Sequence, residues 1–397
     1  MAFAAIVAIS LWMVYLRCPG RPYIAGIFIL WGATASAPIW GVRPQMFSLL
    51  LASIFLLILE RSDKYPGLLW WTAPLTVLWV NLHGGYLVGI GLMILFLADN
   101  VLELMFGSED WKKAAPHLRR LALALFACLV VVPLNPNGTR MYRYPLETIR
   151  SRSMQSYVEE WFSPNFHQAK ELPFLLMLLA VLLAQGLSLR RFRARELLLL
   201  LVTTWLALHS ARHIAIFVLV AVPMLSASAQ FCLEERGAAS WVGSTVSSPR
   251  LPRMPINVMI LVAFAVFSIA RVRAVIRDQP KTEAQHFPAA AVSFLARQRP
   301  PGPIMNNYNW GGYLIAKLYP EYRVFIDGRA DLYGDSFMDD FSATYHLTDG
   351  WKRPIEQWHI RTILLPPDAP LATALRSQAG WKEIYADSQS VILTQTQ

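Results

Sequence analysis

The sequence predicts an α-helical polytopic membrane bundle of about ten spans, followed by a small C-terminal α/β domain. Of the 397 residues, 55% are hydrophobic and only 16% are charged, whereas soluble domains carry about 25% charged residues. The apolar runs are concentrated in residues 1–277, which we assign to the membrane domain. Residues 278–397 have an ordinary globular composition and are assigned to a soluble domain outside the cytoplasm.

Each predicted span is an apolar run that ends at charged or turn-forming residues. A bilayer core of about 30 Å needs about 20 apolar residues in a helix. Two of the runs, 45–59 and 196–209, are short for a span, so the number of spans is predicted to within one or two. The ten runs are 2–16, 22–40, 45–59, 66–82, 85–106, 118–134, 172–188, 196–209, 213–230 and 255–270.

The loops between the runs predict the orientation. Lys and Arg are concentrated in alternate connections, and the side richer in these residues faces the cytoplasm. Residues 135–171 and everything after residue 271 then lie outside, which in a bacterial inner membrane means the periplasm. Residues 231–254 form a cytoplasmic loop rich in Ser and Pro. The basic residues assigned to the cytoplasm are Arg17, Arg21, Arg61, Lys64, Lys112, Lys113, Arg119, Arg120, Arg190, Arg191, Arg193, Arg195, Arg236, Arg250 and Arg253.

The formal net charge of +10 follows from this distribution. No basic stripe with interleaved aromatic residues is present, so nucleic acid is not a predicted partner. The three cysteines are far apart and none lies in the C-terminal domain, so no disulfide framework is predicted. Asp99 and Glu103 stand four residues apart, on one face of a span. We expect them at the interface on the cytoplasmic side.

Four polar clusters fall on the predicted outer side: Trp40–Gln45, Trp79–Gly85, Asn135–Gly138 and His209–His213. Polar groups near spans are costly, so they indicate function or packing. Arg43, His83, Arg212 and His213 are candidate substrate-binding residues, because guanidinium groups match phosphate oxygens in pairs. The alternatives are that both arginines extend to the interface with their charged ends in water, and that His83 is structural in a turn.

The outer loop 135–171 is long for a connection, and long loops are often functional. Residues 144–161 are expected to form a short helix on the membrane surface. Glu159 and Glu160 near its end are candidates for a catalytic base or a metal ligand, with a solvated acidic face as the alternative. No His, Cys, Asp or Glu spacing typical of zinc is present, so no metal site is predicted.

Strands and helices alternate in residues 278–397, which indicates a small α/β layer domain. Asp327, Arg329 and Asp331 follow one of its expected strands, where α/β folds usually bind ligands. The spacing suits a cation or a sugar; alternatively, Arg329 pairs internally with the carboxylates. Strands are expected at 304–306, 323–326, 362–365 and 390–393. Helices are expected at 284–298, near 335–343, 350–358 and 370–379, and in a segment that opens within 307–313 and runs to about residue 318.

Several longer motifs resemble a known group of proteins. They are RPQMFSLLL at 43–51, LWVNLHGGYLVG at 78–89, NPNG at 135–138, EEW at 159–161, ARHIAIFVLVAVP at 211–223 and NWGGYLIAKLYPEYRVFIDGRADLYG at 309–334. Together they resemble uncharacterised bacterial polytopic membrane proteins related to the GT-C glycosyltransferases, the superfamily of the protein mannosyltransferases and arabinosyltransferase-like enzymes. The resemblance covers nearly the whole chain.

This resemblance implies sugar transfer at the outer face from a polyprenyl-phosphate donor. The lipid bilayer and that donor are the implied partners, and a divalent cation is allowed as a cofactor. In the superfamily an Asp or Glu in the first large outer loop acts as base or metal ligand. The first outer loop here, residues 41–44, contains no carboxylate, so we expect the catalytic acidic residue and one preceding span to lie upstream of Met1.

The charges around the first run agree with that expectation, because Arg17 and Arg21 after it place the N-terminus outside. Two other functions remain open. One is a non-catalytic membrane scaffold whose C-terminal domain binds glycan or a partner protein. The other is a transporter for a lipid-linked substrate, which the lack of an internal repeat disfavours. Donor sugar, acceptor and oligomeric state are not predicted.

Overall fold

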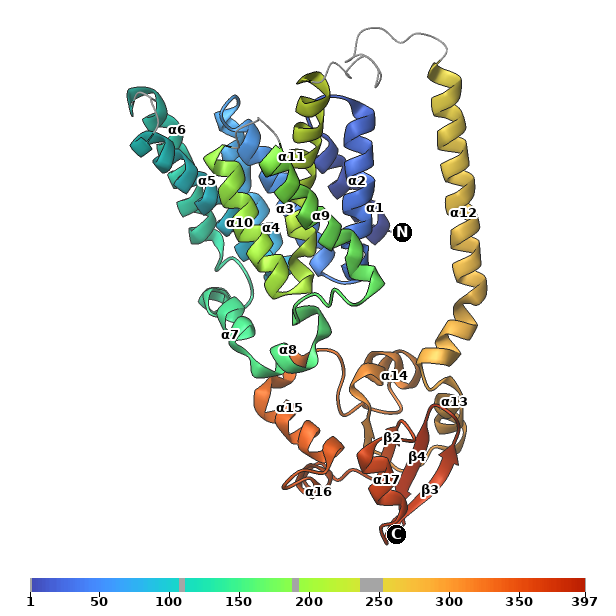
Figure 1. Ribbon diagram of the computed structural model, residues 1–397. Coiled ribbons are helices and arrows are strands. Elements are labelled where there is room, and N and C mark those ends of the chain that lie inside the picture. The colour runs from blue at the N-terminus through green and yellow to red at the C-terminus, as the bar shows by residue number, and fades with distance from the viewer. Residues whose placement is uncertain (1, 107–110, 188–192, 236–252, 397) are drawn as a thin grey trace. The chain divides into compact units, whose positions relative to one another are not determined.

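The computed structural model describes residues 2–106, 111–187, 193–235 and 253–396. The chain divides into two compact units (Figure 1). Met1–Arg150 and Tyr157–Ser247 form the first, called here the helical unit; Ser151–Ser156 and Ser248–Gln397 form the second, called the C-terminal unit. Most of the predicted cytoplasmic loop 231–254 lies outside the described residues, as do Arg190, Arg191, Arg236 and Arg250.

Five helical segments of the described chain are long and apolar enough to cross a membrane: Pro22–Ile39, Gly84–Phe106, Ala114–Val131, Ala169–Gly186 and Ala211–Glu235. Four other expected spans are shorter helices here, whereas the run 255–270 lies within a helix of 34 residues, Arg253–His286. At 1.5 Å per residue, the 17 residues of α3 reach only about 26 Å, and the 11 residues of α4 about 17 Å. The helical membrane character is therefore confirmed, while the number of spans is not.

The helical unit contains α1 to α7, α9, α10 and α11, linked in places by short 3-10 helices. The larger helices are α1 (Ala2–Tyr15), α2 (Pro22–Ser36), α3 (Gln45–Arg61), α4 (Thr72–Leu82), α5 (Leu87–Phe106), α6 (Trp111–Val131), α9 (Leu172–Leu187), α10 (Ala194–His209) and α11 (Ile214–Glu235). Residues 144–161 do not form the expected single helix. They form α7 (Tyr144–Arg150), α8 (Arg152–Tyr157) and the 3-10 turn η5 (Glu159–Trp161).

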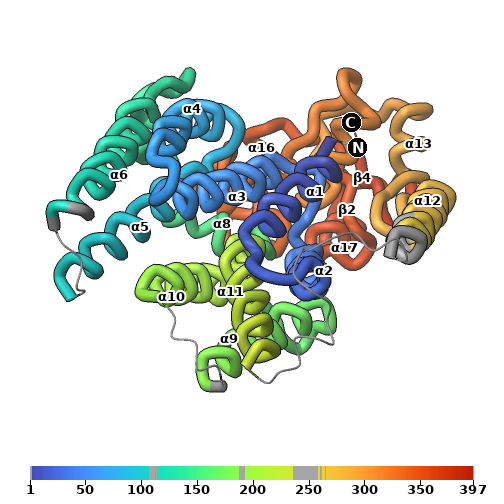
Figure 2. The backbone as a smooth tube through the Cα atoms, turned by 90° about the horizontal axis from the view of Figure 1, so that it is seen from above, coloured from blue at the N-terminus to red at the C-terminus, as the bar shows by residue number. Residues whose placement is uncertain are grey.

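Helix α11 lies among α2, α3, α9 and α10 (Figure 2). Its side chains are buried on every side from Ile214 to Leu225, as expected of a helix that is apolar all round. The contact with α2 is close because Gly32 faces it. A Cβ atom at Gly32 would stand 2.6 Å from Val222 and 2.7 Å from Val218. Small residues allow membrane helices to approach closely in this way.

Pro223 interrupts the hydrogen bonding of α11. Because proline has no N–H, the carbonyl four residues earlier loses its helical partner. That carbonyl belongs to Leu219, and the guanidinium of Arg17 donates to it at 2.6 Å. Arg17 also forms a two-pronged ion pair with Glu60, at 2.8 and 2.7 Å.

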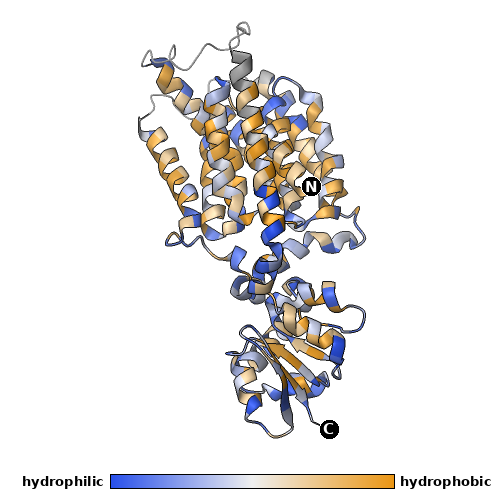
Figure 3. Cartoon of the chain, turned by 90° about the vertical axis from the view of Figure 1, so that its right-hand side faces the viewer, coloured by the Kyte–Doolittle hydropathy of each residue, from blue (hydrophilic) through white to orange (hydrophobic). Residues whose placement is uncertain are grey.

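The outer surface of the helical unit is apolar (Figure 3). Ile27, Leu30, Phe126, Leu182 and Leu201 are each more than 60% exposed. A soluble monomer rarely leaves such large apolar surfaces open to water. Lipid chains are the environment in which these side chains are stable.

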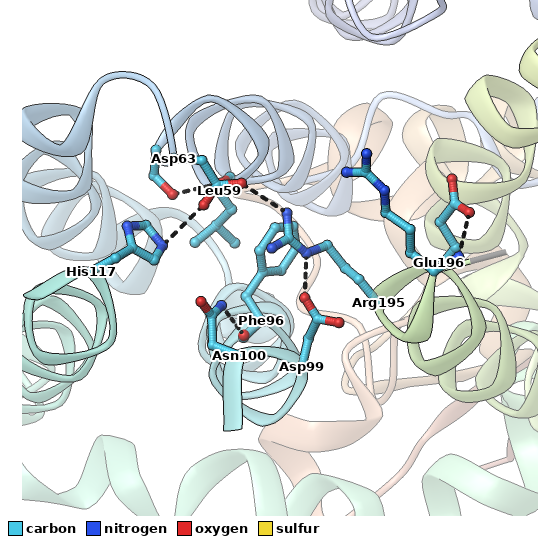
Figure 4. Close-up of polar contacts among 10 residues, drawn as sticks. Leu59, Asp63, Phe96, Asp99, Asn100, His117, Arg195 and Glu196 are labelled. Carbon is cyan, nitrogen blue, oxygen red and sulfur yellow. Dashed lines mark hydrogen bonds and ion pairs between the residues drawn. The ribbon is translucent and has the colours of Figure 1, made fainter. Parts of the chain in front are cut away.

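A network of charged side chains joins the turn after α3 to α5, α6 and α10 (Figure 4). Asp99 is 0% exposed, and the Arg195 guanidinium reaches it with Nε at 2.7 Å. The same guanidinium lies 3.4 Å from Asp63, which is 3.3 Å from the Nε2 of His117. The sequence pattern could not reveal this, because Asp99 and its partner are on helices far apart in the chain.

The C-terminal unit contains a four-stranded sheet in the order β1–β2–β4–β3. Strands β1 (Ile304–Asn306) and β2 (Thr362–Leu365) are parallel, and β4 (Val391–Gln395) runs antiparallel to β2 and to β3 (Trp381–Ala386). The expected strand at 323–326 is only a single bridge between Val324 and Ile304. The reason is local: the Asn306 side chain accepts from the N–H of Phe325 and donates to the carbonyl of Ile326.

Helices cover this sheet and precede it. They are α12 (Arg253–His286), α13 (Ala289–Gln298), α14 (Gly311–Leu318), α15 (Ala330–His346), α16 (Lys352–Gln357) and α17 (Pro370–Arg376). The helix expected at 284–298 is two helices, because the residue before a proline disfavours helical backbone and Pro288 stands at the break. The segment α8 also belongs to this unit in part, through Ser151–Ser156.

Candidate functional site

The four polar clusters of the predicted outer side come together in the helical unit. Asn135 donates from Nδ2 to the carbonyl of Val80 at 3.0 Å, and Asn81 donates to the carbonyl of Leu134 at 2.8 Å. The Ala211 N–H donates to the carbonyl of Phe162 at 2.9 Å. The first two contacts join the end of α4 to the start of the long loop, and the third joins the later part of that loop to the turn between α10 and α11.

His83 occupies the turn between α4 and the 3-10 helix η3 (Gly84–Tyr86). The backbone N–H of Gly85 donates to its Nδ1 at 3.1 Å. The hydroxyl of Ser48 lies 2.7 Å from the same nitrogen and accepts from Trp79 Nε1 at 2.8 Å. Because indole and backbone N–H groups only donate, Nδ1 is the acceptor and Ser48 donates to it. A neutral His83 therefore carries its proton on Nε2.

Burial, and next to it the charge of Arg212, lower the pKa of His83 to about 4. Protonation of a buried imidazole beside a guanidinium costs free energy, because the charged ring lacks water around it and is repelled by the neighbouring cation. His83 is consequently neutral at physiological pH. Its contribution to the site is an uncharged N–H donor.

Arg212 lies in the short turn between α10 and α11 and is half-buried. Its guanidinium carbon stands 4.6 Å from the centre of the Trp161 ring, which is a favourable cation–π distance. Arg43 and Tyr144 are close enough to interact with Arg212 electrostatically. The aromatic ring thus holds a cation in place without neutralising it.

Arg43 forms an ion pair with Glu160. The Arg43 side chain is 56% exposed and that of Glu160 is 25% exposed. The sequence left Glu160 open as part of a solvated acidic face, whereas the structure places it against a candidate substrate-binding residue. Glu159 is exposed.

His213 follows Arg212 in the chain, but within the described part of the chain its ring is left without a hydrogen bond at one nitrogen. Its Nδ1 is buried, with no hydrogen-bond partner among the described residues. The outer cluster, defined here as Arg43, His83, Glu160 and Arg212, therefore combines two guanidinium groups and one neutral N–H donor with one carboxylate. Such a set of donors is suited to the oxygens of a phosphate.

A surface hollow of about 550 Å³ lies elsewhere on the long loop, lined by Thr139, Arg140, Tyr142, Arg143 and Glu147. None of these residues is among the candidate site residues predicted from the sequence. Arg140 and Arg143 are three apart across the 3-10 helix η4 (Gly138–Tyr142), and side chains with this spacing eclipse in such a helix. A prediction of 3-10 structure after the NPNG turn would have paired them.

The other predicted site, Asp327, Arg329 and Asp331, is in the C-terminal unit. Arg329 pairs with the buried Asp327 through Nη2 at 2.6 Å and Nε at 2.9 Å, and its backbone N–H donates to the same carboxylate at 3.0 Å. The hydrogen bonds from Arg329 hold the pKa of Asp327 below its usual value. This geometry is the internal pair that we gave as the alternative. Asp331 lies in the first turn of α15.

Among the described residues, no group of three His, Cys, Asp or Glu side chains is placed to hold a metal ion. The divalent cation allowed by the resemblance therefore has no such set of ligands in those parts of the chain. The sequence matches no model of a known protein family, and no curated protein is significantly similar to it.

Proposed function

We propose that the helical unit binds a polyprenyl-phosphate-linked sugar at the outer face of a bacterial inner membrane and takes part in transferring that sugar. The observation that carries the proposal is the outer cluster. Arg212 interacts electrostatically with both Arg43 and His83, so the cluster offers an anionic group two guanidinium groups and one neutral N–H donor. Arginine forks bind phosphate oxygens in pairs.

The chemistry follows from the same residues. The bond between the sugar C1 and the phosphate oxygen breaks, and the phosphate leaves with the bonding electrons. Arg43 and Arg212 stabilise the negative charge on that phosphate. The acceptor hydroxyl oxygen bonds to C1, and its proton passes to a base. Glu160 is the carboxylate within the cluster and is our candidate for this base.

The proposal also places the chain in the bilayer as a GT-C-like bundle of about ten spans. The five long apolar segments are joined in this arrangement by α1, α3, α4, α10 and the apolar part of α12. The exposed apolar surface of the helical unit supports this. The outer cluster and residues 278–397 then face the periplasm.

The test is binding of the lipid donor to the full chain. We would reconstitute the protein in nanodiscs and measure its affinity for a polyprenyl-phosphate sugar by native mass spectrometry. Arg43→Ala and Arg212→Ala should each weaken binding about tenfold or more, because each removes charge-assisted hydrogen bonds worth about 1.5–3 kcal/mol. Arg61→Ala, which removes an exposed arginine at the other end of α3, is the matched control. Equal affinity in all four proteins would contradict the proposal.

A further inference from the structure

A second hollow, of about 420 Å³, lies in the C-terminal unit. Its lining comes from three parts of that unit: the end of α12 and the residue after it, the segment after β1, and the residue after β2. The lining residues are His286, Phe287, Asn307, Asn309, Trp310 and Pro366. Its volume is at the small end of the roughly 300–1,000 Å³ that ligand pockets occupy.

The position of this hollow follows from the sheet topology. Strands β1 and β2 are parallel neighbours, with Asn306 paired to Leu364. Asn307 follows the last residue of β1, and Pro366 follows the last residue of β2. The hollow therefore opens at the carboxyl ends of two parallel strands, which is the edge where α/β sheets usually bind ligands.

The polar groups of the lining are partly unused. The Asn307 side-chain oxygen accepts from the N–H of Asn309 at 2.9 Å, which fixes the turn. The Asn309 side chain is exposed, and no hydrogen bond engages it within the described chain. His286 Nδ1 lies 2.9 Å from the carbonyl of Thr282 and must donate to it, so a neutral ring offers Nε2 as an acceptor.

The apolar part of the lining is aromatic. Trp310 is 8% exposed, and Phe287 is held by stacking on Tyr313 with 4.7 Å between ring centres. Tyr313 in turn donates to Glu283 at 2.7 Å. The ring at position 287 is thus fixed before any ligand arrives, which lowers the entropic cost of binding.

We propose that this hollow binds one uncharged sugar residue, with the ring against Trp310 and Phe287 and the hydroxyl groups hydrogen-bonded to Asn309 and His286. A hydroxyl both donates and accepts, and so do the amide and the imidazole acceptor taken together. No Asp, Glu, Lys or Arg is among the lining residues, so a phosphate or an ammonium group would find no counter-ion. This sugar site is separate from the phosphate site of the proposed function and does not need a transfer reaction.

The test uses the full chain in detergent micelles, observed by saturation-transfer difference NMR. The probes are free mannose, galactose and N-acetylglucosamine, with glucose 6-phosphate as the charged comparison. At least one neutral sugar should receive saturation, while the phosphorylated sugar should not be preferred. Absence of transfer to all three neutral sugars, or a preference for the charged one, would overturn the inference.

Two variants locate the site. Asn309→Ala removes an exposed amide without breaking a contact, and should weaken sugar binding about tenfold through its lost hydrogen bonds. Gln357→Ala, which removes an exposed amide on α16, is the matched control and should bind as the unaltered chain does. If both variants lose sugar binding, or if neither does, the sugar is not bound in this hollow.

A third variant separates this inference from the proposed function. Arg212→Ala should leave sugar binding at its original level, even where it abolishes binding of the lipid donor. If Arg212→Ala lost binding of the free sugar together with binding of the lipid donor, the sugar would be bound at the outer cluster and not in this hollow.

Discussion

At the scale of single residues, a polar side chain in the helical unit supplies a hydrogen bond that a distant backbone group lacks. Arg17 was counted in the sequence only as a cytoplasmic charge. In the structure its side chain is 2% exposed, and it satisfies the Leu219 carbonyl that Pro223 leaves without a partner. Nothing in the sequence around Arg17 signals this role, because Arg17 is in the turn after α1 and Pro223 is far along the chain in α11.

Arg17→Lys should destabilise the protein in a way that depends on Pro223. An ammonium cannot reproduce the fork to Glu60 together with the bond to Leu219, so we expect a loss of about 1.5–3 kcal/mol. In a Pro223→Ala background the carbonyl can accept from the helix itself, and the loss should shrink by about 1 kcal/mol. Denaturant titration in micelles measures both, with the exposed Arg61→Lys as control. An equal loss in the two backgrounds would refute the compensation.

His83 gives a second prediction at this scale. Its pKa of about 4 lies below the value of about 6.5 in an unfolded chain, so the folded state binds fewer protons. The stability that His83 contributes is complete above about pH 6.5 and is lost as the pH falls towards 4. NMR of ring-labelled histidine, with His83→Gln to assign the signal, should show no titration of His83 between pH 5 and 8. A midpoint near 6.5 would disprove the buried neutral ring.

At the scale of elements, the sequence predicts helices and strands whose formation depends on nearby residues in the chain. It does not predict elements whose backbone hydrogen bonds are determined by residues distant in the sequence. The apolar runs, β1 and β2 were predictable because their side-chain pattern is local. The segment 323–326 looked like a strand, but the Asn306 side chain takes its backbone hydrogen bonds. Strand β3 was missed because it carries polar residues such as Lys382 and Glu383 on an edge. Whether the outer cluster acts as predicted is untested, although its convergence could be foreseen from topology.

The start of α8 is stabilised by hydrogen bonds to one acidic residue of α15. Asp335 accepts from the Ser151 hydroxyl at 2.7 Å and from the Ser153 N–H at 3.0 Å. These hydrogen bonds, first that from Ser151, hold the pKa of Asp335 well below its usual range.

Asp335→Asn should therefore loosen residues 151–156. In the unaltered protein this stabilisation is present above about pH 4, the unfolded pKa of Asp, and is lost as the pH falls towards the lower folded pKa. Hydrogen exchange should speed up in residues 151–156 of Asp335→Asn, with the exposed Asp349→Asn as control. Unchanged exchange in Asp335→Asn would show that the carboxylate does not hold the segment.

At the scale of the whole molecule, the apolar exterior of the helical unit is suited to lipid, whereas residues 278–397 have the composition of a domain in water. The charge asymmetry of the loops decides which side of the bilayer each connection meets. The five long segments alone do not settle this, because the count of crossings sets the side of every later loop.

Reporter fusions test the proposed arrangement directly. Fusions after residues 64, 115, 193 and 245 should report the cytoplasm, and fusions after residues 150 and 290 should report the outside. A cytoplasmic signal at 290 would reverse the orientation and remove the outer cluster from the outer face.

The C-terminal unit is assembled from two stretches of chain, because Ser151–Ser156 belongs to it while the residues on either side belong to the helical unit. This has a consequence for inheritance. A gene fusion that replaced everything after residue 250 would bring in a new α15 but keep the old Ser151 and Ser153. Unless the incoming sequence offered a carboxylate like Asp335, those two serines would lose their acceptor. Recombination therefore cannot exchange the residues after 250 independently of the rest of the chain. They must change together with Ser151–Ser156, which belong to the same unit.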